Sequence, residues 1–389
     1  MKKVEEKLIS PLVLRITIYV ALFVVYIFPQ PLVTNLLKNN FPVDKLIFAV
    51  LTTGLFILNK LYTKRFPKSQ IVFLVISAIA ALACQDLRCL LFIYLLLVED
   101  IIADKDKVLM TIRKSSILYI CLFFTFCYTL IYRSLGIVDT ERFAFSAIGE
   151  INQSGLAIFC LAVMLMQKNK KVGYFTMFFG FLTISRAYFV AVILYLLSKT
   201  NVVKRMVGKI KHWWMYGYPF IVFVSSIILL GIGVFYIHEN ALGNVYWGDN
   251  VENRLFQWMD YSNLFRFMTN IVLVMNFVRA PGYLLTGMSD KIYQQESMVS
   301  YSELGLRYKM VNPHNLFFSH LRMFGLFALA EAWYIGRIMK KVVNKNNLVL
   351  FLVAVFYSVT LGAGLYSYWI VLTFIMLVSE EVLNAGGKR

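Results

Sequence analysis

The chain is divided into apolar runs of roughly 15 to 21 residues, separated by short charged connections, and this pattern limits the folds available to it. A helix needs about 20 residues to cross the hydrocarbon layer of a bilayer. Because lipid offers the backbone no hydrogen-bond partners, such runs are predicted to be helices. Hydrophobic residues make up 59% of the sequence and the mean hydropathy is +0.68, which is far more apolar than a soluble domain. We therefore predict an all-α, polytopic membrane protein, with residues 1–389 forming a single integral membrane domain.

Lysine and arginine are concentrated in every second connection between the apolar runs. The positive-inside rule places these connections in the cytoplasm. Both termini are then cytoplasmic, and the net charge of +18 reflects topology rather than a nucleic-acid partner. The first run is predicted to be a retained helix, because it follows Glu5 and Glu6 and no small-residue cleavage site follows Phe28. About twelve crossings are predicted, at residues 12–28, 45–59, 70–84, 89–103, 115–132, 151–167, 172–185, 187–198, 216–236, 316–336, 348–364 and 366–379.

The connection between the ninth and tenth predicted crossings, residues 237–315, is the only long polar one in the sequence. The basic segments that flank these two crossings are both inside, so the connection lies outside the membrane. Asp249, followed three residues later by a glutamate, resembles a capping box and predicts a helix that presents Arg254 and Trp258 one turn apart. The apolar stretch 267–278 is too short to span and is predicted to be interfacial or re-entrant. We therefore expect a lid of amphipathic helices here; a floppy loop is the alternative.

Several arginines are predicted at the outer face. Arg186 lies between two apolar runs beside Ser185, either as a snorkelling side chain at a tight turn or as a guanidinium that binds phosphate bidentately. Arg142 precedes the start of the sixth crossing, which is a position suited to an anion. Arg322 follows Asn315 by two helical turns, so it must face protein or water rather than lipid. As a set, the outer arginines suit an acidic, membrane-anchored substrate.

His314 closes the long connection and stands directly before an apolar helix. An imidazole at this position can exchange a proton near neutral pH, whereas the alternative is a simple polar cap. His320, within the same helix, is predicted to be interfacial. The five cysteines lack Cys-x-x-Cys spacing and a nearby histidine pair, so neither a metal site nor a cofactor is predicted. No carboxylate pair has glycosidase-like spacing, and no P-loop pattern is present.

Four features between about residues 142 and 328 resemble the O-antigen ligase and polymerase superfamily, especially Wzy-type polymerases of capsular or extracellular polysaccharide. The sequence departs from the ligase histidine motif at its last position, where Ala328 replaces the expected Gly, Thr or Tyr, and this weakens the ligase assignment more than the polymerase one. The features are Arg142 to Asn152, Thr183 to Arg186, Arg254 to Trp258 followed by Pro281-Gly282 and Gly287, and His314-Asn315 followed after nine residues by Gly325.

The resemblance implies a metal-independent, inverting glycosyltransferase that joins undecaprenyl-diphosphate-linked oligosaccharide repeat units at the outer face of the bacterial cytoplasmic membrane. Donor and acceptor are both lipid-linked, membrane lipids surround the protein, and other polysaccharide-assembly membrane proteins are expected partners. Arg186 and Arg254 are expected to neutralise the diphosphate and His314 to orient or deprotonate the acceptor hydroxyl. The expected substrate-binding residues are Arg142, Asn152, Trp258, Arg279, Asn315 and Arg322.

Two other functions fit the predicted topology. A ligase would transfer the glycan to a different acceptor. A lipid-linked oligosaccharide flippase or another secondary transporter would share the crossings, but charges along a central path would be expected for it. The predicted polar residues instead collect at one face, which favours the polymerase.

Overall fold

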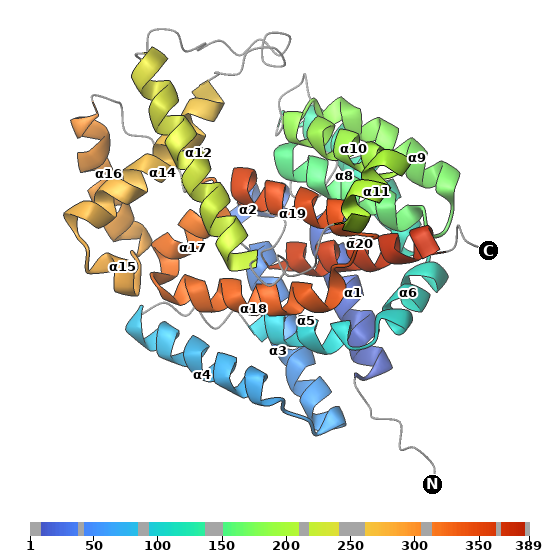
Figure 1. Ribbon diagram of the computed structural model, residues 1–389. Coiled ribbons are helices and arrows are strands. Elements are labelled where there is room, and N and C mark those ends of the chain that lie inside the picture. The colour runs from blue at the N-terminus through green and yellow to red at the C-terminus, as the bar shows by residue number, and fades with distance from the viewer. Residues whose placement is uncertain are drawn as a thin grey trace.

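In the computed structural model every described element is a helix, as the sequence predicts (Figure 1). The structure describes residues 9–37, 43–84, 93–136, 151–209, 218–240, 261–304, 313–362 and 367–385, and no strand occurs among them. The first third contains α1 (Pro11–Tyr26), α2 (Gln30–Leu37), α3 (Val43–Thr63), α4 (Lys68–Ala83), α5 (Ile93–Ile102), α6 (Lys105–Lys114) and α7 (Ile117–Ser134).

The middle of the chain contains α8 (Ile151–Leu165), α9 (Lys170–Phe179), the short 3-10 helix η2 (Gly180–Thr183), α10 (Arg186–Ser198), α11 (Asn201–Lys209) and α12 (Tyr218–Asn240). The last third contains α14 (Tyr261–Arg279), α15 (Tyr283–Thr286), α16 (Asp290–Glu303), α17 (Leu316–Phe324), α18 (Phe327–Val342), α19 (Leu348–Leu361) and α20 (Tyr368–Ala385). All but one of the predicted crossings overlap a single helix, or α9 continued by η2.

Two described helices are long and apolar enough to cross a membrane, α3 with 21 residues and α7 with 18. The other apolar helices have 10–17 described residues. A helix of 14 residues, such as α19, is about 21 Å long and so shorter than a hydrocarbon layer of about 30 Å. Membrane-like helices are therefore present, whereas the count of twelve crossings stays a prediction.

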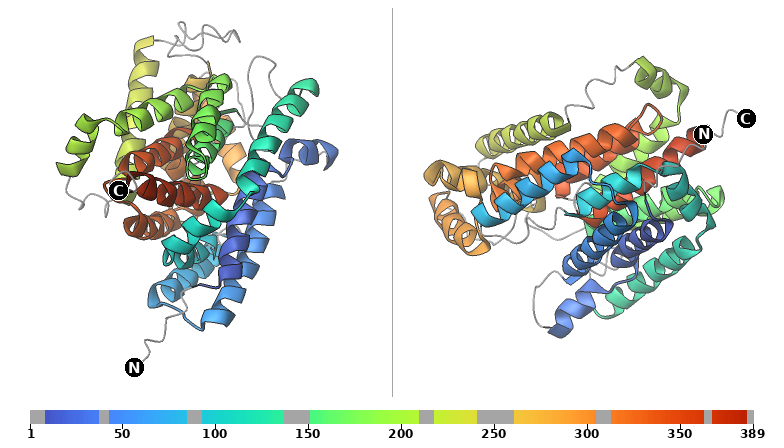
Figure 2. Two further views of the ribbon diagram at one scale, coloured as in Figure 1. Left: turned by 90° about the vertical axis from the view of Figure 1, so that its right-hand side faces the viewer. Right: turned by 90° about the horizontal axis from the view of Figure 1, so that it is seen from below.

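The centre of the bundle is formed by α8 and α20, which pack against each other. Every residue from Leu156 to Met166 is buried, and so is every residue from Tyr368 to Glu380. A helix that is apolar on all sides needs neighbours all round. The helices that surround these two are α1, α6, α7, α9, α10, α18 and α19, and α18 also packs against α12 and α4 (Figure 2).

The predicted crossing 316–336 is wrong as a single helix. It is broken at Gly325, whose φ of +54° lies in a region that residues with a side chain rarely adopt. His320 on α17 pairs with Glu331 on α18, eleven residues later. On a straight helix these residues would be about 16 Å apart, so the chain folds back after Phe324.

The described part of the predicted lid segment, residues 237–315, is mostly helical. It contains α14, α15 and α16, which gather at the left of Figure 1 with α17. The stretch 267–278 lies within α14, a longer helix that packs between α12 and α16. The buried amide of Asn276 on α14 forms hydrogen bonds with the hydroxyl groups of Ser297 and Ser300 on α16.

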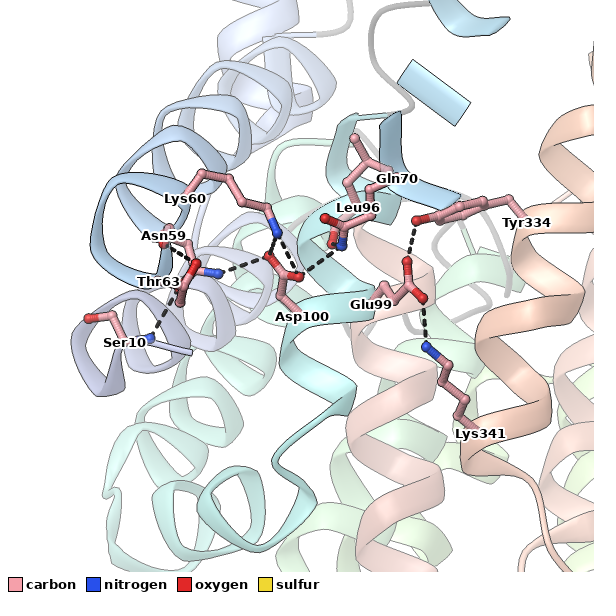
Figure 3. A network of polar contacts seen from close by, with 10 residues as sticks. All are labelled: Ser10, Asn59, Lys60, Thr63, Gln70, Leu96, Glu99, Asp100, Tyr334 and Lys341. Atoms are coloured by element: carbon pink, nitrogen blue, oxygen red, sulfur yellow. Dashed lines mark hydrogen bonds and ion pairs between the residues drawn. The ribbon is translucent and has the colours of Figure 1, made fainter. Parts of the chain in front are cut away.

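A buried polar network joins the ends of α3, α4, α5 and α18, and we call it the inner cluster (Figure 3). Lys60 forms an ion pair with Asp100 at 2.7 Å. The same carboxylate accepts hydrogen bonds at 2.8 Å from the side chains of Asn59 and Gln70. The neighbouring Glu99 points the other way, toward α18. The inner cluster thus fastens four helices at one end of the bundle.

On the α18 side of the inner cluster, Glu99 accepts hydrogen bonds from the hydroxyl of Tyr334 and from Lys341, the latter at 2.6 Å. Lys60 and Lys341 both belong to connections that the sequence analysis assigns to the cytoplasm. Lys199 and Glu380 form a further ion pair between the ends of α10 and α20. Helix ends predicted to share one side of the membrane are therefore joined to one another.

We expect Asp100→Ala to lower the free energy of unfolding by about 3–5 kcal/mol, because Lys60 is then buried without a carboxylate partner. Thermal unfolding of the detergent-purified protein measures the loss. Asp106→Ala is the matched control, since Asp106 is exposed in the first turn of α6, and it should cost less than about 1 kcal/mol. Equal losses in the two variants would contradict a stabilising role for the inner cluster.

Candidate functional site

Arg186 is the first residue of α10 and follows an unusual turn. Ile184 has a φ of +48°, in the left-handed region that is a rare outlier for a β-branched residue. The hydroxyl of Thr183 supports the turn: it donates to the Gly180 carbonyl at 2.8 Å and accepts from the Ser185 amide at 3.3 Å. The turn ends η2 and begins α10, so Arg186 is held at the helix start and is partly buried.

Gly180 lets this turn pack tightly. A Cβ atom there would overlap the ring of Tyr188, whose hydroxyl donates to the Met177 carbonyl. The first turn of α10 is therefore folded back onto α9. Because the position of Tyr188 is fixed, the backbone position of Arg186 two residues earlier is fixed with it.

The N-terminal end of α10 also lies close to the N-terminal end of α8 and to the C-terminal end of α19. A Cβ atom on Gly155 would lie 3.3 Å from the Tyr188 Cβ atom and 3.4 Å from the Tyr357 hydroxyl. Gly155 is therefore a close-packing point among α8, α10 and α19. Asn152, one of the predicted substrate-binding residues, stands at the beginning of the same α8, and its side chain lies outside the described part of the structure.

The start of α17 reaches the same end of α19. Asn315 caps α17 by accepting a hydrogen bond from the Phe318 amide at 3.1 Å, and it donates to the Val359 carbonyl at 2.9 Å. Its amide also forms a hydrogen bond with Ser226 on α12. Asn315 is fully buried, so in this structure it positions the start of α17. His314 directly precedes it and is partly buried.

Arg186 and His314 thus belong to helix starts that converge on one end of α19. Gly155 near the start of α8 lies against both Tyr188 of α10 and Tyr357 of α19, and Val359, two residues after Tyr357, accepts a hydrogen bond from Asn315. The structure therefore brings together three of the segments that the sequence analysis selected, those of Asn152, Arg186 and His314.

Arg322 lies at the other end of α17 and is 2% exposed, as expected for a cation that faces protein rather than lipid. Its guanidinium forms an ion pair with Asp290 on α16 at 2.8 Å and lies 4.9 Å from the centre of the Tyr293 ring. Its Nε atom has no hydrogen-bond partner within the described structure. Arg322 therefore connects α17 with the lid and keeps one buried donor unused.

Arg279 ends α14 and binds two carboxylates of α16. Its guanidinium lies 2.6 Å from Glu303 and 3.4 Å from Glu296, and it donates to Ser300. These contacts are exposed or half-buried. Arg279 thus joins two helices of the lid, and the structure does not bring it to the α19 end where Arg186 lies. Arg142, Arg254 and Trp258 lie outside the described residues.

The buried His320–Glu331 pair was missed in the sequence analysis, which predicts an interfacial His320. His320 is 4% exposed and Glu331 is 1% exposed, and the second carboxylate oxygen of Glu331 has no partner in the described part of the chain. The prediction fails because the break at Gly325 turns α18 back over α17. A glycine inside an apolar run is the one signal that indicates such a break.

Two glycines allow the lid to approach α17. Gly287 has a φ of +76° and Gly325 a φ of +54°. A Cβ atom on Gly287 would overlap the Met323 carbonyl, and one on Gly325 would overlap the Leu285 carbonyl. The Met288 amide donates to the Arg322 carbonyl across the same contact.

No protein-family model, curated protein or solved structure matches this chain. Among the described residues, no group of three or more His, Cys, Asp or Glu side chains is arranged to hold a metal ion. The chemistry of the site must therefore be inferred from the residues that converge at α19 and from those that hold the lid.

We expect Gly325→Ala to destabilise the protein by about 1–3 kcal/mol or more, because the substitution combines a disfavoured backbone conformation with a clash against Leu285. Gly231→Ala on α12 is the matched control, since a Cβ atom there meets open space. It should be neutral or stabilise by about 0.5–1 kcal/mol. The shift of the thermal unfolding midpoint measures both, and an unchanged midpoint for Gly325→Ala would contradict the close contact.

Proposed function

We propose that this protein is a polysaccharide polymerase that joins undecaprenyl-diphosphate-linked repeat units at the outer face of the bacterial cytoplasmic membrane. The observation that carries the proposal is the convergence of the Arg186 and His314 helix starts on one end of α19. An arginine and a histidine at helix starts that meet the same end of α19 would provide the two groups that such a transfer needs: a cation for the departing diphosphate and an acceptor for a proton.

In the proposed reaction, the acceptor hydroxyl of one lipid-linked unit attacks the anomeric carbon of the donor sugar. The bond from that carbon to the diphosphate oxygen breaks, and the lipid diphosphate leaves with the bonding electrons. Arg186 stabilises the charge that develops on the diphosphate, since a guanidinium pairs bidentately with phosphate oxygens. His314 takes the hydroxyl proton. One displacement of this kind inverts the anomeric configuration.

The turn before Arg186 supports a functional role for this residue. A left-handed β-branched residue costs of order 1–3 kcal/mol, and such strain persists where the surrounding structure fixes it, often at ligand-binding sites. A snorkelling arginine needs no such turn, because its long side chain can reach water from many backbone positions. The predicted roles of Arg142, Arg254 and Trp258 belong to the same proposal.

A ligase would use the same donor and the same two residues with a different acceptor. The departure at Ala328 from the ligase histidine motif favours the polymerase. An assay with one pool of lipid-linked units separates these functions, because a polymerase forms a ladder of products whereas a ligase needs a second acceptor.

A lipid-linked oligosaccharide flippase or another secondary transporter is favoured by one observation. The buried His320–Glu331 pair stands at a broken helix, and titratable groups at discontinuous helices are typical of ion-coupled transporters. Reconstitution in vesicles distinguishes this function, since a flippase moves the labelled lipid-linked unit between leaflets without forming a glycosidic bond.

We expect Arg186→Ala and His314→Ala each to lower polymer formation by at least about 100-fold, because one removes leaving-group stabilisation and the other the proton acceptor. Arg186→Lys should also fail, since lysine offers a point charge in place of the bidentate fork. Arg205→Ala, an exposed arginine on α11, is the matched control and should leave activity unchanged. Normal ladders from purified Arg186→Ala or His314→Ala protein at normal membrane levels would refute these roles.

The proposed orientation predicts which cysteines a membrane-impermeant thiol reagent reaches in intact cells. In a cysteine-free background, Met298→Cys on the exposed side of α16 should be labelled without permeabilisation, because the lid is expected outside. Lys170→Cys at the start of α9 should be labelled only after permeabilisation. The reverse pattern would place the lid in the cytoplasm and contradict the proposal.

A further inference from the structure

A pocket of about 490 Å³ lies between the start of α1 and helix α6, far along the chain from the residues of the proposed catalytic site. Polar and basic side chains line much of it: Arg15, Tyr19, Lys107, Thr111, Lys114 and Ser115. The Tyr19 hydroxyl donates to the Ser115 hydroxyl at 3.0 Å and so links α1 to the end of α6. The pocket is therefore formed between two packed helices and not within a single loop.

Two cations of the pocket have no carboxylate partner among the described residues. Lys107 forms an ion pair with Asp104, the residue that caps α6, at 2.5 Å. Arg15 and Lys114 are exposed, and neither forms an ion pair with a carboxylate of the described chain. Two cations at one pocket repel each other unless an anion lies between them, so the pocket has the charge and the hydroxyl donors to bind a phosphate group.

An exposed apolar stripe leads away from the pocket along α1. Leu12, Ile16 and Phe23 are all exposed. They follow one another at intervals of four and seven residues, so with Tyr19 they share one face of the helix. Helix α1 carries this exposed face from the basic pocket toward its own C-terminal end. Inorganic phosphate has no apolar part to contact the stripe, whereas the acyl chain of a lipid can lie along it.

Helix α6 has the character of an interfacial helix. Its buried side consists of Val108, Leu109 and Ile112, and its last turn is basic. Helices of this kind lie at the membrane surface with their cations near lipid headgroups. The α6 lysines lie in the predicted cytoplasmic connection 104–114, and Arg15 lies near the cytoplasmic start of the first predicted crossing, where the leaflet is rich in anionic lipid.

We propose that this pocket binds the headgroup of an anionic phospholipid of the inner leaflet, with the phosphate between Arg15 and Lys114 and an acyl chain along Leu12, Ile16 and Phe23. The bound lipid bridges α1 and α6 and stabilises their packing. This site is independent of the proposed glycosyl transfer at the opposite face of the membrane.

The test compares the purified full-length protein with its Arg15→Gln/Lys114→Gln double variant. Phosphatidylglycerol and phosphatidylcholine are added separately in detergent, and native mass spectrometry counts the retained lipid while thermal unfolding reports stabilisation. Phosphatidylglycerol should raise the unfolding midpoint of the unchanged protein and phosphatidylcholine should not. The double variant should bind phosphatidylglycerol about 30-fold more weakly, because each basic residue near an anionic surface is worth about a fivefold change.

Lys170→Gln/Arg205→Gln is the matched control, since it removes two exposed cations from the same predicted face but outside the pocket, and it should bind as the unchanged protein does. Arg15→Lys should retain most of the binding and guards against a folding defect. If the control variant bound phosphatidylglycerol equally weakly, the loss of binding would reflect general surface charge, and the proposal would be overturned. A matching stabilisation by inorganic phosphate alone would also overturn it, because the occupant would then be free phosphate.

Discussion

The position of the lid depends on one close contact between two backbone segments, which leaves no room for a side chain at either of its two glycines. Gly287 and Gly325 each take a left-handed conformation and each faces a carbonyl of the other segment, so α15 and the end of α17 touch through their main chains. This approach brings Arg322 to Asp290 and places its guanidinium over Tyr293. A larger residue at either glycine would separate the segments and leave the buried Arg322 without its carboxylate, which is costly in an apolar environment.

Among the described residues, each buried cation or carboxylate has a counterion or a hydrogen-bonding partner close by. The long buried stretches of α8 and α20 are almost wholly apolar, and the paired charges lie at helix ends or at the break in the 316–336 run. Asp100 and Glu99 bind lysines at the inner cluster, and Glu331 binds His320 beside the break. The desolvation cost of burying an ion is offset only by an ion pair of good geometry and additional hydrogen bonds. The inner cluster meets this condition, whereas Glu331 keeps one oxygen without a partner in the described structure.

Local sequence signals were sufficient for most helices but not for contacts between distant residues. Apolar runs located the helices, because their length and the need to satisfy the backbone in lipid act on each run separately. The burial of Arg322 followed from the same reasoning. Its partner Asp290 lies 32 residues away along the chain, and no local rule connects the two. The helix break at Gly325 was not predicted because hydropathy is averaged over a whole run. Because this break was missed, His320 was predicted at the membrane interface instead of in the protein interior. The inner cluster escaped notice because Glu99 and Asp100 lie at the end of an apolar run.

Two different devices fix the helix starts that meet at α19. Arg186 is positioned by a strained turn, in which Ile184 keeps a disfavoured conformation because Thr183 and Tyr188 hold both sides of it. The α17 start is positioned by a buried amide, that of Asn315, which spans α12 and α19. Both devices use buried side chains, and they fix the backbone positions from which Arg186 and His314 project. Catalytic groups that must be placed within a fraction of an ångström require this kind of support. Simple surface charges do not, and this contrast is the strongest structural reason to assign chemistry to this end of the bundle.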